Sequence, residues 1–174
     1  MFKEINTIKP FFESPNKEFG VREISRIIKV SPATASKELK ELSKKGVLII
    51  KEERGFSLYR ANLESDLYKD IKVFYNLRKI KDSGILNEIN NFYLKPAIIL
   101  FGSFSNGLDN EKSDIDLTII SEKTKEFPKL KEFETKLKRE LHFFIVKDLK
   151  DLKNTNLINN VLNGIVIQGE IKWT

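Results

Sequence analysis

Residues 97–107 read AIILFGSFSNG, and residues 113–120 read SDIDLTII. The first stretch opens with five consecutive apolar residues, a pattern typical of a buried strand. It continues into Gly102 and Ser103, where a short helix would begin, and Gly107 would end that helix. A glycine-serine turn of this kind directs backbone N–H groups outward, and such donors bind phosphate. We therefore predict a phosphate-binding turn in which Gly102 allows close backbone approach.

The second stretch places two carboxylates on one face of a strand. Residues i and i+2 of a strand share a face, so Asp114 and Asp116 point the same way, with Cα atoms roughly 6–7 Å apart. Convergent carboxylates suit Mg²⁺, which takes oxygen ligands and keeps substrate phosphates in its shell. Two such ions roughly 4 Å apart can clamp an in-line nucleotidyl displacement. We predict that Asp114 and Asp116 hold the metal; for an isolated Asp-X-Asp pair, a solvated strand face is the alternative.

Taken together, the strand, the Gly102-Ser103 turn, Gly107 and the aspartate pair resemble the polymerase-beta-type nucleotidyltransferase superfamily in its minimal form. The resemblance covers residues 96–170 and implies a small mixed sheet flanked by helices. It implies that the glycine-serine loop holds a nucleoside triphosphate and that the aspartates bind Mg²⁺ or Mn²⁺. We assign nucleotide binding to Gly102, Ser103, Gly107 and Ser113.

The resemblance also implies a third carboxylate from a later strand, and here the sequence departs from the pattern. Residues 139–146 read RELHFFIV, and the best register puts His142 where the acid should be. Imidazole is a poorer partner for Mg²⁺ than carboxylate, but neutral imidazole can act as a general base. Glu140 lies two residues earlier on the same strand face, and it takes the place of the third carboxylate if the register shifts. A catalytically weak or inactive site is the alternative.

The first third of the chain has the pattern of two helices joined by a turn. Residues 21–29 carry apolar side chains at helical spacing, and Ser31 with Pro32 then signals the start of a second helix. This helix runs to about Lys45, and Gly46 stops it. Two short stretches rich in apolar residues follow, one on each side of a turn at residues 54–55. This pattern predicts a hairpin over 47–62. The pattern is that of a helix-turn-helix with a wing.

Segment 17–62 resembles the winged helix-turn-helix transcription regulators of bacteria and archaea. In that arrangement, small and hydroxyl-bearing residues at the start of the second helix approach base edges, while basic residues meet phosphate. We predict that duplex DNA is bound by residues of the second helix and the wing: Ser31, Ala33, Thr34, Ser36, Lys37, Lys40, Arg54 and Arg60. A winged helix that docks a protein is the alternative.

Residues 63–95 are predicted to form a helical connector, with a break at Gly84. Its apolar stripe, which includes Leu67, Ile71 and Phe74, is broad for a lone linker helix. The stripe must therefore pack on a module of its own chain or on a second chain, and a homodimer is one expectation. The predicted organisation is α+β: a winged-helix DNA-binding domain at 1–62, the connector at 63–95 and a nucleotidyltransferase-like domain at 96–174.

Composition limits the function classes. The 174 residues contain no cysteine and one histidine, which excludes disulfides, thiol catalysis and a multi-histidine metal cage. The net charge is +6, and residues 1–62 hold 13 Lys and Arg against 8 Asp and Glu, which points to an anionic partner for that segment; a generally lysine-rich composition is the alternative. With no apolar run near 20 residues and no signal-peptide pattern at the start, we expect a cytoplasmic protein without membrane contact.

Three functions follow as hypotheses. The first is metal-dependent transfer of a nucleoside monophosphate from a triphosphate to a hydroxyl of a protein, a small molecule or an RNA end. The second is a DNA-binding regulator whose second domain binds nucleotide or a partner without turnover. The third comes from the resemblance alone, which implies that minimal nucleotidyltransferases often act as antitoxins beside a helical toxin.

Overall fold

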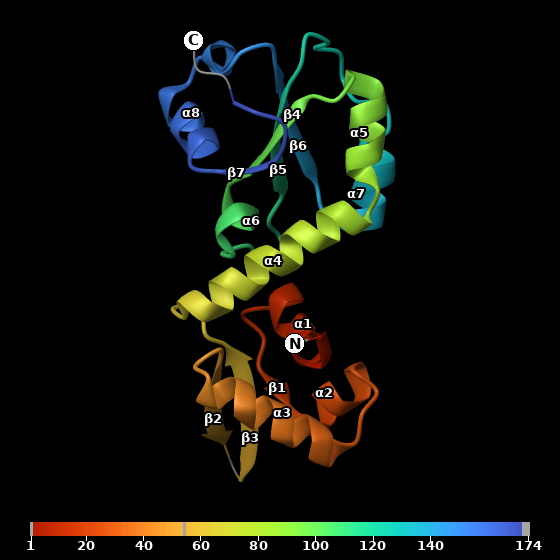
Figure 1. Ribbon diagram of the computed structural model, residues 1–174. Helices are drawn as coiled ribbons and strands as arrows, with labels where there is room; N and C mark the ends of the chain where they lie inside the picture. The colour runs from red at the N-terminus through yellow and green to blue at the C-terminus, as the bar shows by residue number, and fades with distance from the viewer. Residues whose placement is uncertain (1, 54, 172–174) are drawn as a thin grey trace. The chain divides into compact units, whose positions relative to one another are not determined.

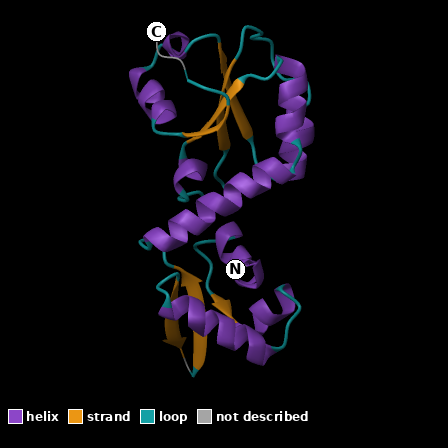
Figure 2. Ribbon diagram, viewed as in Figure 1, coloured by secondary structure: helices purple, strands orange, loops and turns teal. Residues whose placement is uncertain are grey.

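A computed structural model describes residues 2–53 and 55–171. The chain divides into two compact units, Met1–Lys72 and Val73–Thr174, and both mix helices with strands (Figures 1 and 2). The predicted α+β class is therefore confirmed. The boundaries predicted at 62 and 95 stay predictions, because a division by compactness does not test them. Within the described residues, no helix combines the length and apolarity that a membrane crossing requires.

The first unit is a set of helices against a small antiparallel sheet. Its elements are, in order, α1 (Phe2–Glu13), β1 (Phe19–Gly20), α2 (Val21–Ile27), α3 (Pro32–Lys44), β2 (Leu48–Glu53) and β3 (Phe56–Ala61). The sheet order is β1-β3-β2. Helices α2 and α3, followed by the β2–β3 hairpin, are the helix-turn-helix and wing that the sequence predicts.

Helix α3 begins where its capping residues dictate. The backbone N–H of Thr34 donates to the Ser31 hydroxyl at 3.1 Å, and Pro32 occupies the first turn, where its missing N–H costs nothing. After the helix, Gly46 takes the left-handed conformation (φ +72°). Buried Ile24, Ala35 and Leu39 hold α2 and α3 together, which fixes the outward face of α3.

Helix α4 (Asp66–Asp82) buries a different face from the one predicted. Leu67 and Phe74 remain 45% and 48% exposed, whereas Tyr68 and Asn76 are buried. The Tyr68 hydroxyl donates to the carbonyl of Phe11 at 2.9 Å. The buried face is thus selected by polar side chains with specific partners, which a count of apolar positions does not detect. A homodimer through this helix stays a prediction.

The second unit is a mixed four-stranded sheet between helices. Its further elements are α5 (Ile85–Tyr93), β4 (Ala97–Phe101), α6 (Ser103–Asn106), β5 (Ile115–Ile120), α7 (Leu130–Leu137), β6 (Leu141–Val146), the 3₁₀ helix η1 (Leu149–Leu152), α8 (Thr155–Leu162) and β7 (Ile165–Gln168). The order is β6-β5-β4-β7; β5 and β6 are parallel, and β4 is antiparallel to both its neighbours.

Both faces of this sheet are covered, because its central strands are apolar on both sides. Ile98 and Leu100 of β4 pack in a core on the side of α5 and α7, whereas Ile99 and Phe101 pack in a second cluster on the side of η1 and α8 (Figure 1). Buried Ile85, Ile89 and Tyr93 place α5 in the first of these cores. Most of α5 thus supports the sheet, although the sequence places residues 85–93 in the connector.

A buried polar contact ties α6 and the loop after it to helix α4. The side-chain amide of Asn76 donates to the carbonyl of Phe104 at 3.1 Å and to the Asp109 carboxylate at 2.7 Å. Asn76 and Asp109 are 2% and 3% exposed, so these bonds compensate for their loss of water. They hold the segment between β4 and β5 in place.

Candidate functional site

The turn after β4 requires glycine for two reasons. Gly102 has φ +71° and ψ −157°, a region of backbone conformation that is essentially restricted to glycine. A Cβ atom built at this position would also lie 2.5 Å from Oδ2 of Asp116. Phe101 and Asp116 are partners in the antiparallel β4–β5 pair. The predicted phosphate-binding turn and the aspartate strand therefore meet at one end of the sheet.

The other predicted acid-base residues lie at the same end. The parallel β5–β6 ladder pairs Asp116 with His142. Nδ1 of His142 lies 3.2 Å from Oδ1 of Asp116 and 3.7 Å from Oδ2 of Asp114. Ligand atoms of Asp114, Glu140 and His142 all lie within 4.8 Å of one another. The structure thus brings together the four residues to which the sequence analysis assigns catalysis.

The carboxylates of this cluster differ in exposure. The Asp116 side chain is 24% exposed, against 36% for Asp114 and 48% for His142. Burial raises the pKa of Asp116 above its ordinary value, and the nearby Asp114 charge adds to this, although the hydrogen bond from His142 opposes it. An anionic Asp116 is therefore costly without a cation, which is the electrostatic condition for binding a divalent metal.

The remaining predicted nucleotide-binding residues have distinct local roles. Gly107 (φ +70°) ends α6, and its N–H donates to the carbonyl of Ser103. The Ser103 hydroxyl has no hydrogen-bond partner within the described part of the chain. In contrast, the Ser113 hydroxyl accepts the backbone N–H of Asn110 at 2.9 Å and stabilises the turn that leads to Asp114. Because α6 has only four residues, we expect little help from its dipole.

A cavity of about 680 Å³ adjoins Asp114 and Glu140. Its wall includes Lys112, Lys138 and Arg139, which the sequence analysis did not select. The signal that could have found them is their position beside Ser113 and Glu140, since basic residues next to a carboxylate cluster balance its charge. The cavity wall also holds Glu111, Asp114, Glu134 and Glu140, so the three cations offset most of the acidic charge of this cavity.

The predicted DNA-binding residues form an exposed face of α3. Ala33, Thr34, Lys37 and Lys40 are exposed, and Ser36 is half-buried. Ser31 is also exposed, but its hydroxyl is already bonded to Thr34. On β3 of the wing Arg60 is exposed, while Arg54 lies outside the described residues. Glu52 and Glu53 of β2 offset part of the basic charge of the wing, as Glu38 and Glu41 do on α3.

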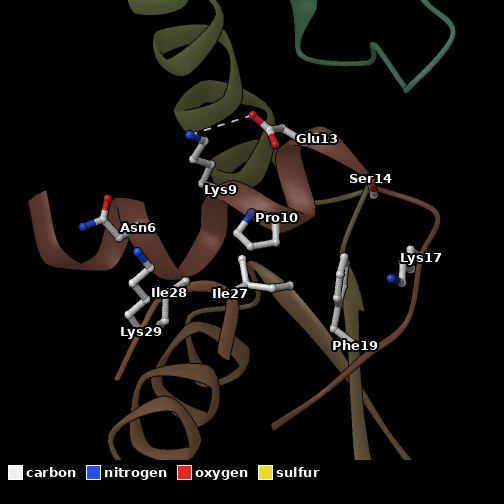
Figure 3. A pocket seen from close by; sticks show the side chains of 10 residues that line it. All are labelled: Asn6, Lys9, Pro10, Glu13, Ser14, Lys17, Phe19, Ile27, Ile28 and Lys29. Carbon is white, nitrogen blue, oxygen red and sulfur yellow. Dashed lines mark ion pairs between the residues drawn. The ribbon is translucent and has the colours of Figure 1, made fainter. Parts of the chain in front are cut away.

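A further cavity, of about 480 Å³, lies within the first unit (Figure 3). Pro10 of α1 and Ile27 of α2 approach each other in its centre, and Lys17 and Lys29 lie toward opposite ends. Lys9 pairs with Glu13 at 4.0 Å. The cavity contains none of the residues assigned to DNA or nucleotide.

A pair of aspartates on a small mixed sheet, one of them against a glycine turn, is the arrangement of a nucleotidyltransferase-type domain. The helices with their hairpin are the arrangement of a winged-helix domain. The comparison with known families agrees. The family model "Polymerase beta, Nucleotidyltransferase" matches residues 85–171, half of the chain, and the chain belongs to this family. Residues 13–56 match the "Iron dependent repressor, N-terminal DNA binding domain". No curated protein gave a significant match.

The Gly102 geometry generates a first prediction. In Gly102→Ala, the new methyl group must displace the Asp116 carboxylate, so we expect binding of a divalent cation to weaken by about tenfold or more, as measured by calorimetry. Gly84→Ala is the matched control, because Gly84 also has positive φ (+83°) but no atom within 4 Å of a built Cβ. Equal losses in both variants would contradict the steric role of Gly102.

The buried charge of Asp116 generates a second prediction. The pKa of Asp116 is raised in the folded protein. The free energy of unfolding therefore falls as pH rises from the pKa of Asp116 in the unfolded chain to its pKa in the folded protein. Below the unfolded-state pKa the carboxyl is protonated in both states and the cost is absent. With metal removed by chelator, Asp116→Asn should therefore raise the free energy of unfolding at about pH 7.5 and lose this advantage toward about pH 4.

Urea denaturation at several pH values measures this difference. Asp70→Asn, on the exposed face of α4, is the control for loss of a carboxylate as such. If Asp116→Asn proves less stable than the wild type at neutral pH, or if its gain does not depend on pH, the burial argument is wrong.

Proposed function

We propose that this protein binds duplex DNA through its first unit and, through its second, transfers a nucleoside monophosphate from a triphosphate to a hydroxyl acceptor with Mg²⁺ or Mn²⁺. The observation that carries the proposal is the placement of Asp116, which lies against the Gly102 turn and shares His142 as a neighbour with Asp114. The family match supports a nucleotide substrate and a divalent metal in general terms. The acceptor hydroxyl belongs to a protein, a small molecule or an RNA end.

In this mechanism the chain orients the triphosphate and manages one proton. The Gly102 turn and the free Ser103 hydroxyl hold phosphate oxygens. The acceptor oxygen then forms a bond to the α-phosphorus, the bond from that phosphorus to the bridging oxygen breaks, and diphosphate leaves. The acceptor proton passes to Glu140 or His142, both of which lie beside Asp114. Lys112, Lys138 and Arg139 lie in the wall of the adjoining cavity and offset most of the charge of its carboxylates.

The donor set fits a divalent cation. Carboxylates from Asp114 and Asp116 would hold it, and the raised pKa of Asp116 marks a carboxylate that is not fully compensated by protein donors. When bound, the cation supplies charge neutralisation on the phosphates. Without such a cation, two carboxylates beside a triphosphate would repel it.

A second candidate is a transcription regulator whose nucleotidyltransferase domain binds nucleotide or a protein without catalysis. The observation that favours it is His142, which occupies the strand position where the family resemblance implies an acid. In its antitoxin-like form, the partner would be a helical toxin-like protein. The two candidates share the DNA-binding role and differ only in turnover.

Loss of one carboxylate tests the transferase. The wild-type protein, incubated with each radiolabelled triphosphate, Mg²⁺ or Mn²⁺ and a cell extract as source of acceptors, should transfer label. Asp114→Asn should reduce the initial rate by about 100-fold or more, since charge neutralisation at the phosphates supplies several kcal/mol. Asp109→Asn is unsuitable as a control because it alters a buried contact, so Asp70→Asn, on an exposed side chain, takes that place.

Label that survives in Asp114→Asn would refute the assignment of the site. Triphosphate binding without any transfer, checked by calorimetry and mass analysis, would select the regulator.

Duplex binding tests the first unit. Lys37 is exposed on α3 and has no ion pair within the described part of the chain. Lys37→Ala should weaken binding and reduce the slope of affinity against salt by about one charge. Fluorescence anisotropy with genomic fragments at several salt concentrations measures both. Lys129→Ala, an exposed cation in the second unit, should leave binding unchanged; equal effects would assign the affinity to net charge alone.

A further inference from the structure

His142 occupies a position from which one ring nitrogen faces both aspartates. Its Nδ1 lies 3.2 Å from Asp116 and 3.7 Å from Asp114. A cation held between these two carboxylates would therefore find the imidazole nitrogen at its side. His142 is also the single histidine among the 174 residues, so the imidazole chemistry of this chain is concentrated at this one site.

The backbone keeps His142 in this place. Six consecutive residue pairs, from Ile115 with Leu141 to Ile120 with Val146, form the parallel ladder. The ladder is extended at its start by the N–H of Ile115, which donates to the carbonyl of Glu140 at 2.9 Å. A shift of register by one residue would turn every side chain of β6 to the opposite face and expose Leu141, which is buried.

We infer that His142 is a metal ligand, and that this site selects a divalent transition-metal ion that accepts imidazole, with Mn²⁺ as the working ion, over Mg²⁺. The inference rests on the proposed function, which places a divalent cation at the aspartate pair. Mg²⁺ prefers all-oxygen donors. Affinity for a site with nitrogen and oxygen donors rises along the first-row transition metals from Mn²⁺ to Cu²⁺, and Mn²⁺ is the member of that series that also suits carboxylates. The donor atoms here are carboxylate oxygens of Asp114 and Asp116 with one imidazole nitrogen of His142.

A neutral imidazole ring can take this role without losing a proton. Without metal, the Nδ1–H group of neutral His142 can donate to Asp116 at the observed distance. To bind a cation, Nδ1 must present its lone pair, and the ring then carries its proton on Nε2. This is a change of tautomer with no net proton released. The ring is 48% exposed, so water can accept from the relocated N–H.

If His142 is a metal ligand, the choice between Glu140 and His142 as the proton acceptor is also decided. If Nδ1 of His142 holds the cation, the imidazole is not the base, and Glu140 receives the acceptor proton. Glu140 is exposed and lies within the same cluster of ligand atoms, which suits a group that exchanges protons with solvent.

Electron paramagnetic resonance of Mn²⁺ bound to the full-length, tag-free protein with a triphosphate tests the inference. Inorganic tripolyphosphate serves as the triphosphate because it contains no nitrogen. Since the chain has one histidine, modulation from an imidazole ¹⁴N in the spin-echo signal then identifies His142. We expect this modulation in the wild type and in Glu140→Gln, and its loss in His142→Asp. In calorimetry, the wild type should bind Mn²⁺ more tightly than Mg²⁺ by about tenfold or more in Kd. The ratio of the two Kd values should be smaller in His142→Asp.

Circular dichroism and triphosphate binding check that His142→Asp keeps its fold. If the His142→Asp variant unfolds, the wild-type protein labelled with ¹⁵N-histidine is used instead of the variant. Modulation that comes from His142 must then change from the ¹⁴N to the ¹⁵N pattern. Mn²⁺ bound without imidazole modulation overturns the role of His142 but leaves the proposed function intact. Equal affinity for Mg²⁺ and Mn²⁺ overturns the selectivity. Absence of any divalent cation binding overturns the inference and the proposed function together.

Discussion

The register of three neighbouring strands is the constraint on which the candidate site depends. β4 and β5 pair Phe101 with Asp116, and β5 and β6 pair Asp116 with His142. These pairings set the glycine turn, the acids and the imidazole at one end of the sheet. Because a slip of one residue would reverse inward and outward faces, the apolar residues that fill the core also fix the polar residues of the site. Packing and chemistry are specified by the same alternation.

The site also places a local burden on stability. Burial raises the pKa of Asp116, and Gly102 holds a backbone conformation that only glycine adopts easily. Neither feature helps the domain to fold. Both make sense where a carboxylate must stand close to a backbone turn that a ligand approaches, and the apolar packing on the two faces of the sheet compensates for them.

The sequence predicted those parts of the structure that depend on short-range rules. The i and i+2 spacing put Asp114 and Asp116 on one face, and Ser31 with Pro32 marked the start of α3. In contrast, the sequence did not indicate which face of α4 packs within its own chain, because Tyr68 and Asn76 are buried through bonds to distant residues. Lys112, Lys138 and Arg139 adjoin Ser113 and Glu140 in the sequence but went unnoticed, because that proximity alone does not show that they line one cavity. The two-residue strand β1 was too short to leave a pattern.

The position of β6 at the edge of its sheet has a consequence for how such a domain can evolve. A residue on β6 has one neighbouring strand, whereas Asp116 on β5 is enclosed by two. Replacement of an acid by histidine at position 142 therefore disturbs few contacts, while the same change at 116 would disturb the centre of the sheet. Natural variation in metal preference within this architecture should accumulate on the outer strand, where selection can change the chemistry without rebuilding the scaffold.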